Sequence, residues 1–345
     1  MTEFTLAERR ALSRAVSQVE NRAAGYEDLL SAAYANPEWA TVIGITGPPG
    51  AGKSTLVDVL TAHWGADGSG IAVLAIDPSS PFSGGAVLGD RIRMEHSAAL
   101  PNVFFRSLSA RGNIGGLSEA TCDLIALISA RGFQRILVET VGAGQSDVEV
   151  TGLADCTLVV AVPGLGDSVQ ALKAGIMEIA DVYAVNKSDL PDAAATRHQI
   201  EAMLSVAYVG RPGVDMPNRK HAPPPATSGV QALMRRHGDA WSESTIWRPP
   251  VVPVTARSGM GIDDLCAAVD QFIGWSRDSG RLRRKRELRI RDQVLRGLTR
   301  RLLQPYRGDG DTVPAILKPW VEAIVAGRVN PIEAVEALLS GGPFG

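Results

Sequence analysis

The sequence has few cysteines and no long apolar run. Its three cysteines, Cys122, Cys156 and Cys266, are odd in number and form no C-x-x-C pair, so we expect reduced thiols packed in apolar cores. No segment approaches the roughly 18 apolar residues needed to span a bilayer, and the chain's start lacks the apolar stretch of a signal peptide. These absences predict a cytoplasmic protein without a membrane partner.

An excess of charge of either sign is also missing. The chain has 35 Lys and Arg against 37 Asp and Glu, which leaves a formal net charge of −2. Such a balance provides no global field for nucleic acid or for an anionic membrane. The 345 residues, 45% of them hydrophobic, suffice for one large domain with appendages or for two modest domains.

The clearest motif that is present is a phosphate-binding loop. Residues 47–55 fit the pattern G-x-x-x-x-G-K-[ST] and lie between an apolar run and a helix-like run. Glycines let backbone N–H groups approach a polyphosphate, Lys53 adds a positive charge, and Ser54 offers a hydroxyl to Mg²⁺. The predicted phosphate-binding residues are Gly47, Gly50, Ala51, Gly52, Lys53, Ser54 and Thr55.

Short apolar runs alternate with helical ones from Thr41 onward. This alternation indicates an α/β fold with a mostly parallel sheet that is covered on both faces, and ligands bind at the carboxyl ends of such strands. The expected strands are residues 41–46, 71–76, 103–106, 136–139, 158–162, 182–185 and 251–254.

Helical segments flank this region on both sides. Residues 1–40 are expected to form a helical extension, with Leu12, Val16, Val19 and Ala23 on one helix face. We place the nucleotide-binding domain at residues 41–280, including a proline-rich loop at 210–228, and a helical arm at 281–345 with a last helix at 331–339.

The arm begins with a basic run, which would suit nucleic acid. Leu288, Leu295, Leu298 and Leu302 nevertheless recur at helical spacing, so we favour an amphipathic helix whose apolar stripe needs a partner surface.

A second motif indicates which base is bound. Asn186, Lys187, Ser188 and Asp189 follow an expected strand and fit the N-K-x-D element of GTP-binding proteins. A carboxylate at Asp189 accepts hydrogen bonds from N1–H and the 2-amino group of guanine, whereas adenine offers neither donor. Asn186 would tie the loop to the base edge and the Lys187 stem would lie along the ring. Thr255 and Ala256 occupy the place of the element that touches the guanine O6.

Three carboxylates are candidates for Mg²⁺ and the hydrolytic water. Asp77 and Glu139 stand at the ends of expected strands, and Asp90 lies in a glycine-rich loop. Together with Ser54 they form the predicted metal site, although Asp and Glu at such places are also common helix caps. Residues 139–142 resemble the D-x-x-G switch element, and Gln145 is a candidate for orienting water, with packing or exposure as alternatives. The predicted catalytic residues are Lys53, Asp77, Glu139 and Gln145.

Together, residues 77–80, 84–91, 106–117, 139–147 and 186–189 closely resemble the MeaB/ArgK family over nearly the whole chain. The resemblance implies a G3E-type, SIMIBI-class P-loop fold and a Mg²⁺-dependent GTPase that converts GTP to GDP. It also implies a chaperone that gates adenosylcobalamin loading into, and protection or reactivation of, an acyl-CoA mutase such as methylmalonyl-CoA mutase. In this family Asp77, Asp90 and Glu139 match the metal carboxylates.

The resemblance further implies assembly and partners. The C-terminal arm would be the homodimer contact, cobalamin would be held by the mutase, an adenosyltransferase is a further candidate partner, and residues 163–173 would be an additional switch facing the mutase. Ala143, Asp147 and the long loop at 210–228 depart from the usual pattern, which leaves sister mutases such as 2-hydroxyisobutyryl-CoA mutase open as clients.

Two other functions remain as alternatives. A P-loop kinase of ArgK type would transfer the γ-phosphate to a small molecule or a protein, but the guanine-recognition pattern and the lack of a readable acceptor pocket count against it. A nickel-insertion GTPase would usually carry a His-rich tract or a Cys/His cluster, whereas the five histidines here are scattered.

Overall fold

The computed structural model describes residues 4–35, 39–78, 97, 100–110, 116–140, 145–164, 179–208, 246–306 and 312–340. The chain divides into two compact units, Met1–Arg289 and Ile290–Gly345. None of the helices within those ranges is long and apolar enough to cross a membrane.

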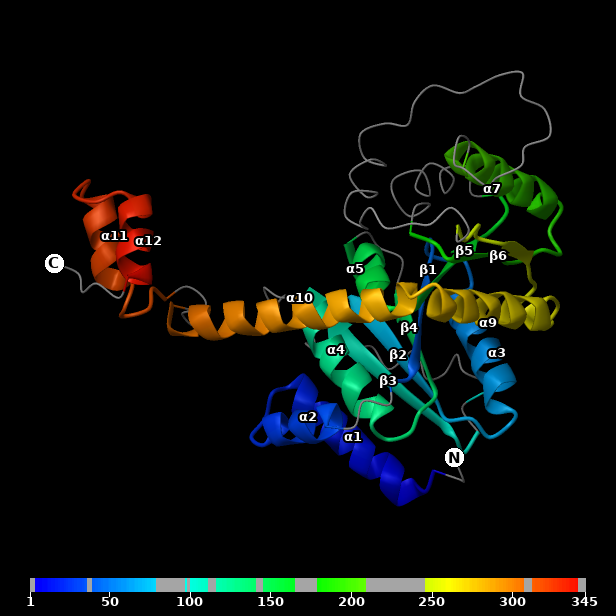
Figure 1. The fold of residues 1–345 in the computed structure, drawn as a ribbon, viewed down its shortest axis with the longest axis horizontal. Coiled ribbons are helices and arrows are strands. Elements are labelled where there is room, and N and C mark those ends of the chain that lie inside the picture. The colour runs from blue at the N-terminus through cyan, green and yellow to red at the C-terminus, as the bar shows by residue number, and fades with distance from the viewer. Residues whose placement is uncertain are drawn as a thin grey trace. The chain divides into compact units, whose positions relative to one another are not determined.

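The first unit is built on a parallel sheet of seven strands in the order β3-β2-β4-β1-β5-β6-β7 (Figure 1). The strands are β1 (Thr41–Thr46), β2 (Ile71–Pro78), β3 (Val103–Ala110), β4 (Arg135–Thr140), β5 (Cys156–Ala161), β6 (Val182–Val185) and β7 (Val251–Pro253). The predicted parallel α/β sheet is therefore confirmed. Because the strands are parallel, their carboxyl ends share one edge, where the predicted site residues should gather.

Helices cover both faces of this sheet. On one face, α3 (Lys53–Gly65) and α9 (Ile262–Asp278) pack against Ile43, Ile45 and Leu158. On the other face lie α4 (Gly116–Ser129), α5 (Gln145–Leu153) and α7 (Ala193–Tyr208). Side chains along each strand alternate between the two cores, because successive residues of a strand point to opposite faces.

The helical extension consists of two helices, α1 (Leu6–Glu20) and α2 (Tyr26–Tyr34). Leu12, Val16 and Val19 are buried as predicted. The placement of Ala23 on the same face was wrong: it lies exposed in the turn between the helices, where Arg22 and Gly25 both have positive φ. Helical spacing cannot continue through a left-handed turn.

The expected strands at 71–76 and 103–106 continue beyond their predicted carboxyl ends. β2 and β3 stay paired through Asp77 with Ser109 and Pro78 with Ala110, beyond the last alternating hydrophobic residues. Backbone hydrogen bonds, and not side-chain polarity, decide where a strand ends.

The basic start of α10 (Arg281–Leu303) lies against buried carboxylates at the amino edge of the sheet. Asp155 directly precedes β5 and is 1% exposed. It accepts two hydrogen bonds from Arg286, at 3.2 and 2.6 Å, and lies 3.5 Å from Arg289. It also accepts the backbone N–H of Val42 at 3.1 Å.

Asp181 is a second buried carboxylate of this kind, at the next strand of the sheet. It directly precedes β6, accepts a hydrogen bond from Arg281 at 3.1 Å and lies 3.8 Å from Lys285. Burial lowers the pKa of Lys285, and Asp181 acts in the opposite direction. Four cations of the basic run, Arg281, Lys285, Arg286 and Arg289, thus pair with buried carboxylates of the same chain.

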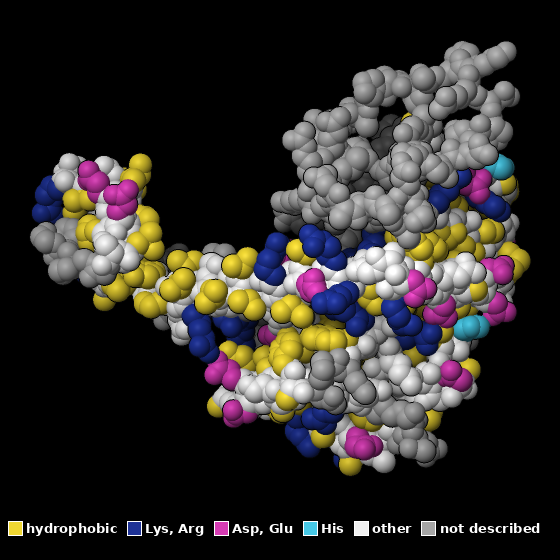
Figure 2. Space-filling view, in the orientation of Figure 1, with side chains coloured by type: hydrophobic (Ala, Val, Ile, Leu, Met, Phe, Trp, Pro, Cys, Tyr) yellow, Lys and Arg dark blue, Asp and Glu magenta, His cyan; other side chains and the backbone are white. Residues whose placement is uncertain are grey.

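The second unit contains the end of α10, the short 3₁₀ helix Gln304–Tyr306, α11 (Lys318–Val325) and α12 (Pro331–Leu339). The last helix matches its predicted bounds and begins with a capping box of Asn330 and Glu333. Figure 2 shows apolar side chains along the second half of α10 and over α11 and α12. Those more than 50% exposed are Val294, Leu295, Leu298, Leu302, Val325, Ile332, Val335 and Leu339.

Candidate nucleotide-binding site

The phosphate-binding loop lies between β1 and α3, as predicted. β1 ends at Thr46, and α3 begins at Lys53 after a turn in which Gly47, Gly50 and Gly52 all have positive φ. A Cβ on Gly47 would collide with the carbonyl oxygen of Val160 in β5. Only glycine therefore lets the loop leave the sheet along this path.

Lys53 is folded back over its own loop. Its Nζ donates hydrogen bonds to the carbonyl oxygens of Gly47 at 2.8 Å and Pro48 at 3.0 Å, and the residue is only 6% exposed. The ammonium group is thus held within the loop at the amino end of α3, where the helix dipole also favours an anion. A bound phosphate would compete for the same protons.

A hydroxyl and a carboxylate meet beside this loop. Ser54, in the first turn of α3, donates a hydrogen bond of 2.7 Å from Oγ to Oε1 of Glu139 near the end of β4. Oxygen ligands of this kind suit Mg²⁺. Asp77 lies near the end of the neighbouring strand β2, two residues beyond Ala75, which pairs with Glu139. Its backbone therefore reaches the same sheet edge.

Asn186 joins three segments that are distant in the sequence. Its Nδ2 donates to the carbonyl oxygen of Ala51 in the phosphate-binding loop at 2.8 Å. Its Oδ1 accepts the backbone N–H of Ala256, after β7, at 3.0 Å. The residue is buried. The phosphate-binding loop and both predicted base-recognition elements therefore lie together at one edge of the sheet.

The two charged residues of the base element are exposed beside Asn186. Lys187 has a left-handed backbone, with φ of 57°, and its Nζ donates to the carbonyl oxygen of Gly50 at 3.0 Å. The Asp189 carboxylate is exposed and accepts a hydrogen bond of 3.4 Å from the Thr255 hydroxyl. An exposed carboxylate at this edge is available to a base.

Not every predicted residue falls within the described ranges of the chain. Asp90 and residues 165–173 lie outside them, as do Ala143 and the loop at 210–228. Asp77 and Gln145 are placed by their backbone alone, in β2 and at the start of α5, and Thr55 lies in the first turn of α3. Among the residues described, no group of three His, Cys, Asp or Glu side chains is arranged to hold a metal ion.

Ser188 occupies the variable position of N-K-x-D and is not among the site residues predicted from the sequence. The structure places its hydroxyl 2.9 Å from Thr255 Oγ1. Nothing in the local sequence signals this contact, because the two residues are 67 positions apart.

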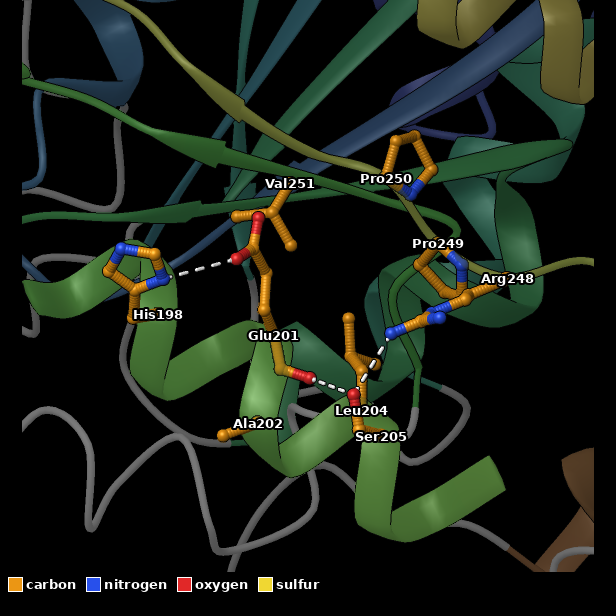
Figure 3. A pocket seen from close by; sticks show the side chains of 9 residues that line it. All are labelled: His198, Glu201, Ala202, Leu204, Ser205, Arg248, Pro249, Pro250 and Val251. Atoms are coloured by element: carbon orange, nitrogen blue, oxygen red, sulfur yellow. Dashed lines mark hydrogen bonds and ion pairs between the residues drawn. The ribbon is translucent and has the colours of Figure 1, made fainter. Parts of the chain in front are cut away.

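A separate groove lies between α7 and the segment that leads into β7 (Figure 3). Its cavity volume is about 470 Å³, and its lining includes Glu201, Ser205 and Arg248. Arg248 donates a hydrogen bond to Ser205 Oγ at 2.9 Å. None of the predicted nucleotide-binding residues lines this groove, and it lies at the amino end of β7, away from the site described above.

The chain is similar to several known proteins. The profile of the family described as methylmalonyl Co-A mutase-associated GTPase MeaB matches residues 12–309. A putative GTPase of Pyrococcus abyssi is 40% identical over 287 residues, which are 83% of this chain and 79% of the relative. The GTPase ArgK of Escherichia coli is 33% identical over 81% of this chain and 77% of its own. A crystal structure described as a LAO/AO transport system kinase superposes with a TM-score of 0.61 at 25% identity, covering 96% of this chain and 93% of that one.

Proposed function

The chain belongs to the MeaB family of methylmalonyl-CoA mutase-associated GTPases, and we propose that it uses a Mg²⁺-dependent GTP switch to serve an acyl-CoA mutase. The site assignment depends on two hydrogen bonds of the Asn186 side chain, one to the carbonyl oxygen of Ala51 and one from the backbone N–H of Ala256. A buried side chain that links the phosphate-binding loop to the base elements sets the distance between the two ends of one nucleotide.

We assign phosphate binding to the backbone of residues 47–52 together with Lys53, Ser54 and Thr55. Guanine would lie against Lys187, place its O6 near Thr255 and Ala256, and donate to Asp189. GTP and GDP fit such a site, whereas an adenine would leave the Asp189 carboxylate without its two donors.

Mg²⁺ would be held by Ser54 and by the carboxylates of Asp77, Asp90 and Glu139. The hydroxyl–carboxylate contact between Ser54 and Glu139 supports this, because it brings the two oxygens to 2.7 Å from each other beside the phosphate-binding loop. When bound, the ion would neutralise charge on the β- and γ-phosphates. Lys53 would bind the same oxygens, and Gln145 would orient the attacking water.

The family and the character of the site support the proposed chaperone role. A nucleotide that replaces the internal bonds of Lys53 and Ser54 would rearrange the loops at this sheet edge, and a mutase could bind one arrangement better than the other. The corrinoid would be held by the mutase. An adenosyltransferase that supplies cofactor is a further partner in this proposal.

The second unit is proposed to carry the homodimer contact. Its described helices leave many large apolar side chains exposed, as the amphipathic pattern of residues 288–302 predicts for a surface that meets a partner. A second copy of the chain would cover them.

GTP turnover with and without candidate mutases tests the main proposal. The isolated protein should hydrolyse GTP slowly, because no arginine of the sequence is an evident arginine finger, and its client should accelerate turnover by ordering the switch loops. Methylmalonyl-CoA mutase and its isobutyryl-, ethylmalonyl- and 2-hydroxyisobutyryl-CoA sisters would each be added in turn. Failure of all of them to stimulate would refute the chaperone role.

The same assay distinguishes a GTPase from the alternative P-loop kinase by the acceptor of the γ-phosphate. Labelled γ-phosphate should be released to water as inorganic phosphate. Its appearance on a protein or a small metabolite would instead identify a P-loop kinase.

A further inference from the structure

Ser188 connects two strands at the edge where the base would bind. It follows β6 by three residues, and its backbone N–H donates to the carbonyl oxygen of Val254, just after β7, at 3.0 Å. Its side chain continues the link, because Ser188 Oγ lies 2.9 Å from Thr255 Oγ1. The loop that carries Asp189 is therefore joined to the neighbouring loop by two contacts from one residue.

The hydroxyl protons of Ser188 and Thr255 decide which group donates in each of the two side-chain hydrogen bonds. Thr255 Oγ1 also lies 3.4 Å from Asp189 Oδ1, and a carboxylate can only accept. The single hydroxyl proton of Thr255 must then go to Asp189. Ser188 must donate its own proton to Thr255, which leaves a directed chain from Ser188 through Thr255 to Asp189.

We propose that Ser188 is a positioning residue for guanine recognition: it orients Asp189 through Thr255 and thereby adds to the preference for a base with a 2-amino group. This inference rests on the proposed role of Asp189. The contact between Thr255 and Asp189 is long, at 3.4 Å, so its strength depends on how well the Thr255 hydroxyl is aimed at the carboxylate. Donation from Ser188 supplies that direction, and hydrogen bonds in a chain strengthen one another.

The test compares binding of GDP and of inosine diphosphate, which lacks only the 2-amino group. Calorimetric titration of wild type, S188A and S188T gives the ratio of the two dissociation constants. One hydrogen bond of ordinary strength corresponds to a change of about three- to tenfold in this ratio. We expect S188A to lower the GDP preference by that factor and S188T, which keeps the hydroxyl, to retain most of it.

Ser258 provides a matched control. Its Oγ donates to the backbone oxygen of Thr255 at 3.3 Å, so it contacts the main chain of Thr255 and not the hydroxyl that faces Asp189. S258A should therefore leave the ratio unchanged. If S188A weakens binding of both nucleotides equally, or if S188A and wild type have the same ratio, the positioning role is refuted.

Two more variants keep the outcome decisive. D189A should abolish most of the discrimination, and if it does not, the base-site assignment itself fails independently of Ser188. T255V breaks the same chain at its next hydroxyl while preserving side-chain shape. Because the chain runs through Thr255, adding S188A to T255V should lower the ratio no further, and an additional loss of the same size would refute the role of Ser188.

Discussion

Arg286 donates two hydrogen bonds to Asp155, from Nε to Oδ1 at 3.2 Å and from Nη2 to Oδ2 at 2.6 Å. In this pair the planar guanidinium group of Arg286 faces the planar carboxylate of Asp155. The Asp155 side chain is fully buried. This contact attaches the start of α10 to the amino edge of the sheet, opposite the nucleotide-binding edge.

Replacing Arg286 should therefore destabilise the first unit. R286A leaves the Asp155 carboxylate with fewer partners, and loss of one member of a buried pair costs about 3–5 kcal/mol, reduced here because Arg286 is partly exposed. We expect the free energy of unfolding to fall by about 2–3 kcal/mol in urea titrations.

R283A is the matched control for that measurement. Arg283 lies on the same helix and pairs with Glu287, but both side chains are exposed to solvent. Its replacement should change the free energy of unfolding by no more than about 0.5 kcal/mol. Equal effects of the two substitutions would contradict the anchoring role of Arg286.

The contact of Ser54 with Glu139 makes a prediction about magnesium. E139Q keeps the size of the side chain but removes one of the charges that would attract the ion, so Mg²⁺ should raise the affinity for GTP, relative to EDTA, less in E139Q than in the wild type. The wild type should bind at least about tenfold more tightly with Mg²⁺, which corresponds to about 1.4 kcal/mol. E201Q on α7, where Glu201 pairs with Arg197, should behave as the wild type does. A normal magnesium effect in E139Q would remove Glu139 from the metal site.

Asp189 should determine which purine is bound. D189N presents an amide N–H₂ donor in place of one carboxylate oxygen, which suits the 2-carbonyl of xanthine and opposes the 2-amino group of guanine. We expect D189N to lose at least about tenfold in GDP affinity and to gain affinity for xanthosine diphosphate. Competition titrations measure both, and an unchanged order of affinities would refute the assignment.

Cys266 should affect stability at alkaline pH. Burial raises the pKa of its thiol from 9.0 to about 12, with Asp270 contributing in the same direction. The folded state thus holds the proton more tightly than the unfolded state does. The resulting stability is complete below pH 9.0 and is lost as the pH rises toward about 12.

Between about pH 9 and 11, the free energy of unfolding should therefore fall less steeply with pH in C266A than in the wild type. The two slopes should differ by up to about 1.4 kcal/mol per pH unit. Chemical denaturation at a series of pH values gives the two slopes. Parallel curves would show that Cys266 does not titrate differently in the two states.

Truncation should produce a folded monomer if it is placed after Arg289. A cut after residue 285 would also remove Arg286 and Arg289, which pair with Asp155, and would confound dimer loss with unfolding. The chain ending at Arg289 keeps the whole first compact unit. Sedimentation should give the monomer mass with nucleotide binding retained, whereas a dimer at micromolar concentration would place the contact elsewhere.

Much of this architecture was predictable because its signals are local. The phosphate-binding loop needs glycine and lysine at set spacing, and a buried parallel strand needs a continuous apolar run, so β1 and β6 were predicted with their observed bounds. The basic run at the start of α10 was correctly predicted to be helical. Its partners were not predictable, because Asp155 and Arg286 are 131 residues apart and neither has a distinctive pattern.

The sequence by itself determined which chemical groups this protein carries and in what order: a phosphate-binding loop, two strand-end carboxylates and an N-K-x-D element, each specified by neighbouring residues. Only the tertiary structure decided how they meet. Asn186 reaches Ala51 across 135 positions and Ser188 reaches Thr255 across 67, because parallel strands bring their carboxyl ends to one edge irrespective of their separation along the chain.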